Sequence, residues 1–358
     1  MLVFCLIFTL TVTYSIAGYL TDFHEQGIFI ALYIIPVPIY FAMQVFRYSE
    51  VTLIRIFVLF TIIAFAMTML EFYTRNYTNT SPFDFMGYWH SLGSGAEAID
   101  RKIYPFLGNL LRPFGPMGRS HANGVMFSGL ATMALVLFRM EKEHRILSFM
   151  MLICALAGIY ISGAWTAVLC FVPMAFISIF GFRLRNMIVA IIVGFFVTAI
   201  FIGITDTQSH GEYLRLGFVS LKVGTGIFWH LSQWKYWVYL IFGQGVSASA
   251  HNMEFGTEIG WFGIFAEAGT INIILFTLAL VTYVRYCLRL KRAAGDTLCW
   301  AGMFYVLTVL AGAVHYRPFF VFPANVLTLA IMGYTAHRYM AYLRRCKMQS
   351  VGFEDGSV

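Results

Sequence analysis

Charged residues are scarce in this chain of 358 residues: only 11% are Asp, Glu, Lys or Arg, whereas 59% are hydrophobic. So little polar surface cannot cover a water-soluble globule, which excludes that class. The apolar runs are continuous rather than alternating, which also excludes a membrane β-barrel. Because backbone amides in hydrocarbon must be paired within their own segment, the sequence predicts an all-α, polytopic helical bundle in a membrane.

Several chemical signatures are missing. None of the six cysteines lies where it could crosslink an outer loop, and no cysteine spacing resembles a metal site. There is no internal repeat, low-complexity tract or Gly-rich phosphate loop. The first 17 residues lack a basic leading segment, which favours a retained first helix, although Ser15 and Ala17 would permit cleavage. We therefore expect no metal and no cofactor.

The apolar runs predict about ten transmembrane helices in a single transmembrane domain over residues 1–358. Two long polar stretches, about 71–119 and 206–258, become outer loops. The predicted helices lie near 1–20, 28–46, 52–70, 120–138, 146–161, 164–181, 186–205, 259–284, 297–314 and 319–337.

Lys and Arg predict the orientation. Of the 24 basic residues, 15 lie in the connections after the second, fourth, sixth and eighth helices or near the C-terminus. These segments all fall on one side, which the positive-inside bias assigns to the cytoplasm together with both termini. Most of the positive charge behind the net +7 thus lies in the predicted cytoplasmic connections and reflects membrane orientation. We therefore expect no nucleic-acid partner.

The second outer loop holds the first candidate site. Gly243 and Gly245 allow backbone to approach a ligand closely, and His251 and Asn252 follow them at the outer mouth of the eighth helix. A neutral imidazole there is suited to take a proton from a hydroxyl, or it could simply cap the helix. Arg215 offers a planar fork for phosphate oxygens, or it could pair with a neighbouring carboxylate or a lipid headgroup.

Other polar residues could line the same site as substrate-binding groups. Arg119 and His121 stand at the outer start of the fourth helix and could complete a phosphate clamp, although an interfacial Arg is ordinary. Glu258 is suited to a helix N-terminus, and Glu267 lies deeper, where a carboxylate is functional or paired. Arg317, in a short outer turn, could reach the cavity or anchor the interface.

The motifs together resemble a known family, the O-antigen polymerases and O-antigen ligases of the bacterial envelope. The resemblance covers about residues 115–270. Its motifs are Gly118-Arg119, Arg215, Gly243-x-Gly245, His251-Asn252 and Glu258-x-Gly260-x-x-Gly263. One difference lies in the outer turn 161–166, where Trp165 stands near the position at which relatives often carry an arginine.

The resemblance implies a metal-independent, inverting glycosyltransferase in the bacterial inner membrane. It would polymerise undecaprenyl-diphosphate-linked repeat units into O-antigen or exopolysaccharide at the outer face. By the same resemblance, His251 deprotonates the acceptor hydroxyl, and Arg215 and Arg119 hold the diphosphate leaving group. The implied partners are lipid-linked glycan donor and acceptor, membrane lipid and a chain-length regulator.

Three alternatives stay open. An O-antigen ligase would transfer finished polymer to lipid A core, but the compact 206–258 loop leaves limited outer surface for docking that acceptor. A flippase or transporter for the same lipid-linked sugars usually has paired halves and a midplane site. Here the polar groups collect at the outer mouth instead. A non-catalytic envelope scaffold would leave the deep Glu267 without a purpose.

Overall fold

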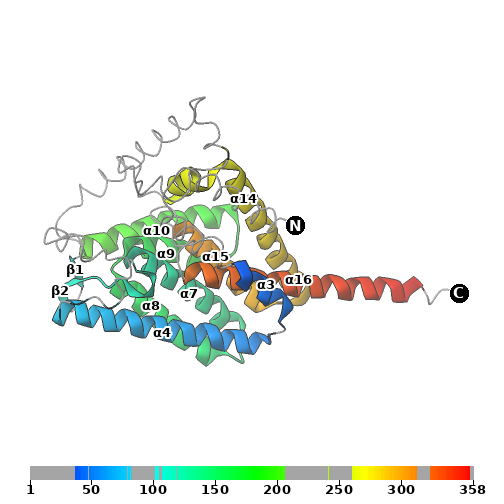
Figure 1. Ribbon diagram of the computed structural model, residues 1–358, viewed down its shortest axis with the longest axis horizontal. Coiled ribbons are helices and arrows are strands. Elements are labelled where there is room, and N and C mark those ends of the chain that lie inside the picture. Colours follow the sequence, from blue (N-terminus) through cyan, green and yellow to red (C-terminus); the bar gives the residue numbers. More distant parts are fainter. Residues whose placement is uncertain are drawn as a thin grey trace, which may run out of the picture.

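The computed structural model is mostly helical in the residues that it describes (Figure 1). The described residues are 37–46, 48–78, 101–104, 107–118, 120–205, 260–312 and 323–354, with the single positions 80, 82 and 241. Within them are nine α-helices: α3 (Val37–Val45), α4 (Glu50–Tyr77), α7 (Ser120–Met140), α8 (Arg145–Ser162), α9 (Trp165–Phe180), α10 (Leu184–Thr205), α14 (Gly260–Ala294), α15 (Thr297–Ala311) and α16 (Ala324–Glu354). Strands β1 (Arg101–Tyr104) and β2 (Gly108–Leu111) form an antiparallel hairpin, followed by the 3₁₀ turn η2 (Gly115–Met117).

The prediction of a mostly helical chain is confirmed in the described residues, and several of these helices are candidate membrane spans. Four stretches are long and apolar enough to cross a bilayer: α4, α7, α8 and the part of α14 from Gly269 onward. The helices α9, α10 and α15 are also apolar, but their apolar stretches are shorter than those of the four candidate spans. Every described helix falls in or over one of the predicted segments, while the predicted helix 1–20 lies outside the described residues.

The predicted helix ends need correction in three places. Helix α4 continues to Tyr77, so the start of the predicted outer loop 71–119 is helical. Helices α14 and α16 run on to Ala294 and Glu354, well past the predicted ends near 284 and 337. An apolar run predicts which part of a helix lies in hydrocarbon. The helix itself can continue beyond that part as long as its backbone hydrogen bonds do. The β1–β2 hairpin also departs from a purely helical prediction.

Helix α7 lies at the centre and packs against α8, α9 and α15. Small residues make this close approach possible, as is usual between membrane helices. A Cβ atom on Gly124 would lie 2.6 Å from Ser162 Oγ, and one on Gly129 would lie 2.8 Å from Val309 Cγ2. Around this core, α4 packs on α8, α10 on α9 and α16 on α3.

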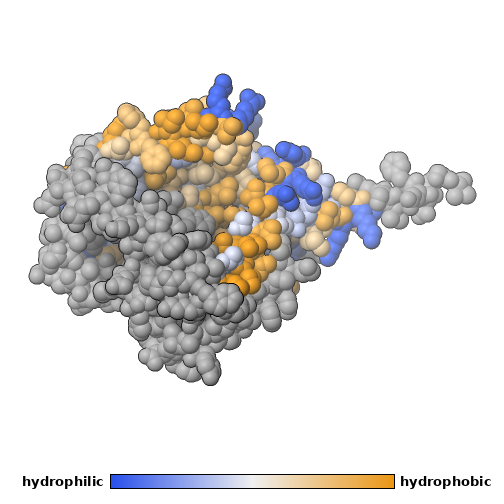
Figure 2. Space-filling view, turned by 90° about the horizontal axis from the view of Figure 1, so that it is seen from above, coloured by the Kyte–Doolittle hydropathy of each residue, from blue (hydrophilic) through white to orange (hydrophobic). Residues whose placement is uncertain are grey.

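The short connections rich in basic residues gather at one end of the bundle. Arg139 donates to the carbonyl of Ser178 (3.1 Å), and Lys291 Nζ lies 3.8 Å from Met140 Sδ, so α7, α9 and α14 end together. Helix α16 projects from this basic end, where hydrophilic side chains border a broad hydrophobic surface (Figures 1 and 2). The β1–β2 hairpin lies at the opposite end, which we call the hairpin end.

Candidate functional site

Most residues proposed from the sequence lie outside the described residues. These are Arg119, Arg215, Gly243, Gly245, His251, Asn252, Glu258 and Arg317. Glu267 belongs to α14, just before the kink at Gly269, and only its place in the helix is described. His121 is the predicted site residue whose surroundings are defined, and it lies in a polar cluster that the sequence did not predict.

A buried polar cluster lies at the hairpin end, formed by Glu71, Arg75, Arg112, His121 and Asn123. The first three side chains and Asn123 are at most 5% exposed, and His121 is half-buried. They come from α4, from the segment after β2 and from the first turn of α7. Burying ionisable groups beside apolar helices costs free energy unless they are paired or functional, so this hairpin-end cluster is the candidate site.

Glu71 fastens the η2 turn to α4. The backbone N–H of Gly115 donates to Glu71 Oε2 at 2.5 Å. Gly115 has φ +63°, and a Cβ there would lie 2.4 Å from Asn123 Nδ2, so glycine alone fits the position. Asn123 in turn donates to Thr68 Oγ1 at 3.1 Å. The turn is therefore fixed between α4 and α7.

Arg75 and Asn76 hold the backbone of the segment that carries Arg112. Arg75 donates to the carbonyl of Arg112, and its guanidinium lies 4.0 Å from the ring centre of Phe114. Asn76 accepts from the N–H of Leu111 (2.8 Å) and donates to the carbonyl of Leu111 (3.0 Å). Since Glu71 and Arg75 are one helical turn apart, one face of α4 determines where Arg112 lies.

Arg112 reaches His121 and the turn between α8 and α9. Its NH1 lies 3.1 Å from His121 Nε2. A guanidinium can only donate, so Nε2 accepts and the hydrogen of the neutral ring sits on Nδ1, 3.5 Å from Thr166 Oγ1. Gly163 ends α8 with φ +57°, and a Cβ there would lie 3.1 Å from Arg112 Cδ. Arg112 thus brings a guanidinium to the turn that contains Trp165.

This arrangement can hold an anion. A guanidinium provides a planar set of donors that matches phosphate oxygens, and the adjoining imidazole is partly exposed. Among the described residues, no three His, Cys, Asp or Glu side chains are grouped as metal ligands. Glu71, Arg75 and Arg112 were missed because 71–119 was treated as a loop. The spacing of Glu71 and Arg75, four residues apart after the last apolar turn of α4, could have predicted that the helix continues and places both on one face.

Comparison with known proteins identifies no relative: the chain matches no protein-family model, no curated protein and no solved structure. The class defined by the fold is therefore a mostly helical protein with candidate membrane spans and a buried guanidinium–imidazole cluster at one end.

Proposed function

We propose that this protein is a polysaccharide polymerase, a metal-independent inverting glycosyltransferase of the bacterial inner membrane. It has ten membrane spans, both termini in the cytoplasm and two long outer loops. Its donor and acceptor are glycans on undecaprenyl diphosphate, and it extends them into O-antigen or exopolysaccharide together with a chain-length regulator. The observation that supports this most directly is the Arg112–His121 contact at the end of the bundle opposite the basic connections.

The position of the cluster fits a lipid-linked diphosphate. By the positive-inside bias the basic end faces the cytoplasm, so the hairpin end faces outward, where lipid-linked sugars are polymerised. A diphosphate anchored in lipid stays at the membrane surface, where helices end. His121 lies in the first turn of the apolar helix α7, and Arg112, in the segment after β2, contacts it there. Arg119 lies between Gly118, which ends η2, and Ser120, which begins α7, and is thus a chain neighbour of this cluster.

The proposed reaction is a single displacement at the anomeric carbon. His251 takes the proton of the acceptor hydroxyl while its oxygen bonds to the anomeric carbon of the donor. The bond from that carbon to the diphosphate oxygen breaks, and the leaving group keeps the electron pair. Arg215, Arg119 and Arg112 hold and neutralise the diphosphate, and inversion follows from the single displacement.

Substitution of His251 and Arg112 tests the proposal. His251→Ala should accumulate single lipid-linked repeat units and abolish long chains while the protein still inserts. Arg112→Lys keeps the charge but loses the fork, and we expect shortened or sparse polymer on a gel of extracted polysaccharide. Arg145→Lys, at an exposed position of the basic end, is the matched control and should leave polymer unchanged.

Each alternative predicts a different product. If His251→Ala cells make long polymer that stays on its lipid carrier, the protein is a ligase. If repeat units never reach the outer face, it is a flippase. Normal polymer in both His251→Ala and Arg112→Lys cells contradicts the polymerase proposal.

A further inference from the structure

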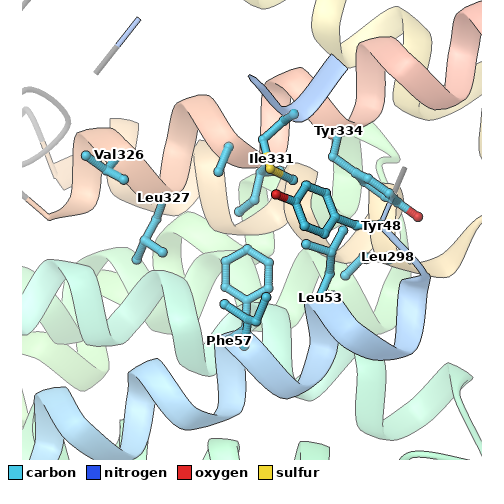
Figure 3. Close-up of a pocket in the computed structure, with 11 residues that line it drawn as sticks. Tyr48, Leu53, Phe57, Leu298, Val326, Leu327, Ile331 and Tyr334 are labelled. Carbon is cyan, nitrogen blue, oxygen red and sulfur yellow. The ribbon is translucent and has the colours of Figure 1, made fainter. Parts of the chain in front are cut away.

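We propose that a cavity near the basic end binds one acyl chain of a zwitterionic phospholipid, whose phosphate contacts Arg338. This inference is independent of the polymerase reaction and requires only that the chain is embedded in a membrane. The cavity lies between α3, α4 and α16, with Leu298 of α15 at one side. In Figure 3, Leu53 and Phe57 of α4 face Leu327 and Ile331 of α16 across it.

The cavity is suited to hydrocarbon. Its volume is about 220 Å³, far more than the roughly 10–15 Å³ that a single water molecule requires. Apart from the two tyrosines, Tyr48 and Tyr334, every lining side chain is apolar. Ordered water needs several polar partners, which this lining does not offer. An alkyl chain gains dispersion contacts with the same walls.

The cavity reaches the lipid-facing surface. Tyr48 and Ile56 line it and are also 39% and 47% exposed. An acyl chain can therefore enter sideways from the bilayer without crossing a polar surface.

Charged groups at the basic end complete an amphiphilic site. Leu298 lines the cavity, and its N–H donates to Glu50 Oε1 at 3.2 Å. Arg338 lies one helical turn after the lining residue Tyr334, and its Nε contacts Asp296 Oδ2 at 2.7 Å. The Arg338 side chain is 40% exposed, and its two terminal nitrogens make no hydrogen bond within the described part of the chain. These two terminal nitrogens can donate hydrogen bonds to two oxygens of one phosphate group.

The balance of charge indicates the kind of head group. Among the described residues, two carboxylates, Glu50 and Asp296, lie beside the guanidinium of Arg338. They oppose a polyanionic ligand such as a nucleotide. A phosphate that carries its own ammonium, as in phosphatidylethanolamine, matches both signs. The apolar cavity and the half-exposed Arg338 together favour this lipid over a peptide segment or a second copy of the chain.

Photolabelling in nanodiscs tests the site. The full-length protein is reconstituted with phosphatidylethanolamine that carries a diazirine near the end of one acyl chain, and labelled residues are mapped by mass spectrometry. We expect labels on cavity residues of α4 and α16. Ala330→Phe places a ring in the existing space and should abolish them. Leu59→Phe adds a ring at an exposed position of α4 and should leave them.

The head-group contact has its own variant. Arg338→Lys keeps the ion pair with Asp296 but loses the fork, and we expect roughly tenfold weaker retention of phosphatidylethanolamine in native mass spectrometry, as for one lost charge-assisted hydrogen bond. Equal cavity labelling in Ala330→Phe and Leu59→Phe overturns the proposal. So does a photoreactive residue at position 56 that crosslinks to another segment of the chain or to a second copy.

Discussion

Replacing Glu71 by alanine removes the carboxylate that fixes the η2 turn to α4. The N–H of Gly115 donates to that carboxylate at 2.5 Å, and Glu71 is fully buried. A hydrogen bond to a charged group contributes roughly 1.5–3 kcal/mol, so we expect Glu71→Ala to lower the free energy of unfolding by about 2–3 kcal/mol. Glu71→Gln keeps an acceptor oxygen and loses the charge, so about 1 kcal/mol is expected.

Buried thiols provide the assay. Cys170, Cys287 and Cys299 are buried and free, so a thiol-reactive fluorophore reports unfolding of detergent-solubilised protein as they become exposed. The exposed Cys346 is replaced by serine in every sample. A loss of 2 kcal/mol raises the unfolding constant by roughly thirtyfold, since each 1.4 kcal/mol is tenfold.

The control removes the same charge from an exposed turn. Glu143 lies between α7 and α8, and Glu143→Ala should change stability by no more than about 0.5 kcal/mol. If Glu71→Ala and Glu143→Ala unfold alike, the carboxylate does not hold the turn, and the account of how Arg112 is positioned fails.

Three further predictions follow from the same contacts. Gly124→Leu should prevent close packing of α7 and sharply reduce the folded yield, because its Cβ would lie 2.6 Å from Ser162 Oγ; a folded yield equal to wild type would contradict this packing. Asn76→Leu removes the acceptor of the Leu111 N–H, so hydrogen exchange at that amide should accelerate about tenfold for 1.4 kcal/mol, whereas an unchanged rate would argue against the contact. Cys346, exposed near the end of α16, should react with a membrane-impermeant maleimide only after cells are opened, and labelling of intact cells would reverse the proposed orientation.

The helical segments were largely predictable because partition into hydrocarbon depends on the composition of each segment. The apolar runs near 120–138 and 146–161 became α7 and α8 with ends that differ by at most two residues. The end of α4 was not predictable in this way, because Glu71 and Arg75 are polar and yet buried against the η2 segment. A polar residue after an apolar run indicates the membrane boundary on average, but here a tertiary partner extends the helix.

The candidate site was only partly predictable. His121 was proposed as part of a phosphate clamp with Arg119, from residue type and place at a helix start. Its contact in the structure is Arg112, which had been assigned to a loop and given no role. No local pattern predicts that contact, since it requires α4 to hold the segment after β2 through Arg75 and Asn76. The predicted residues of the second outer loop stay a prediction.

By itself, the sequence determined that the chain is built mostly from apolar helices and that several short connections between them are basic. Both properties follow from the composition of each segment, because composition decides whether a segment prefers hydrocarbon or water whatever it packs against. Only the tertiary structure decided that Arg112 meets His121 beside Gly163, and that α4 and α16 leave a cavity next to Arg338. These contacts depend on how side chains from distant segments pack. A shift of one helix by a single turn against its neighbour would change all of them.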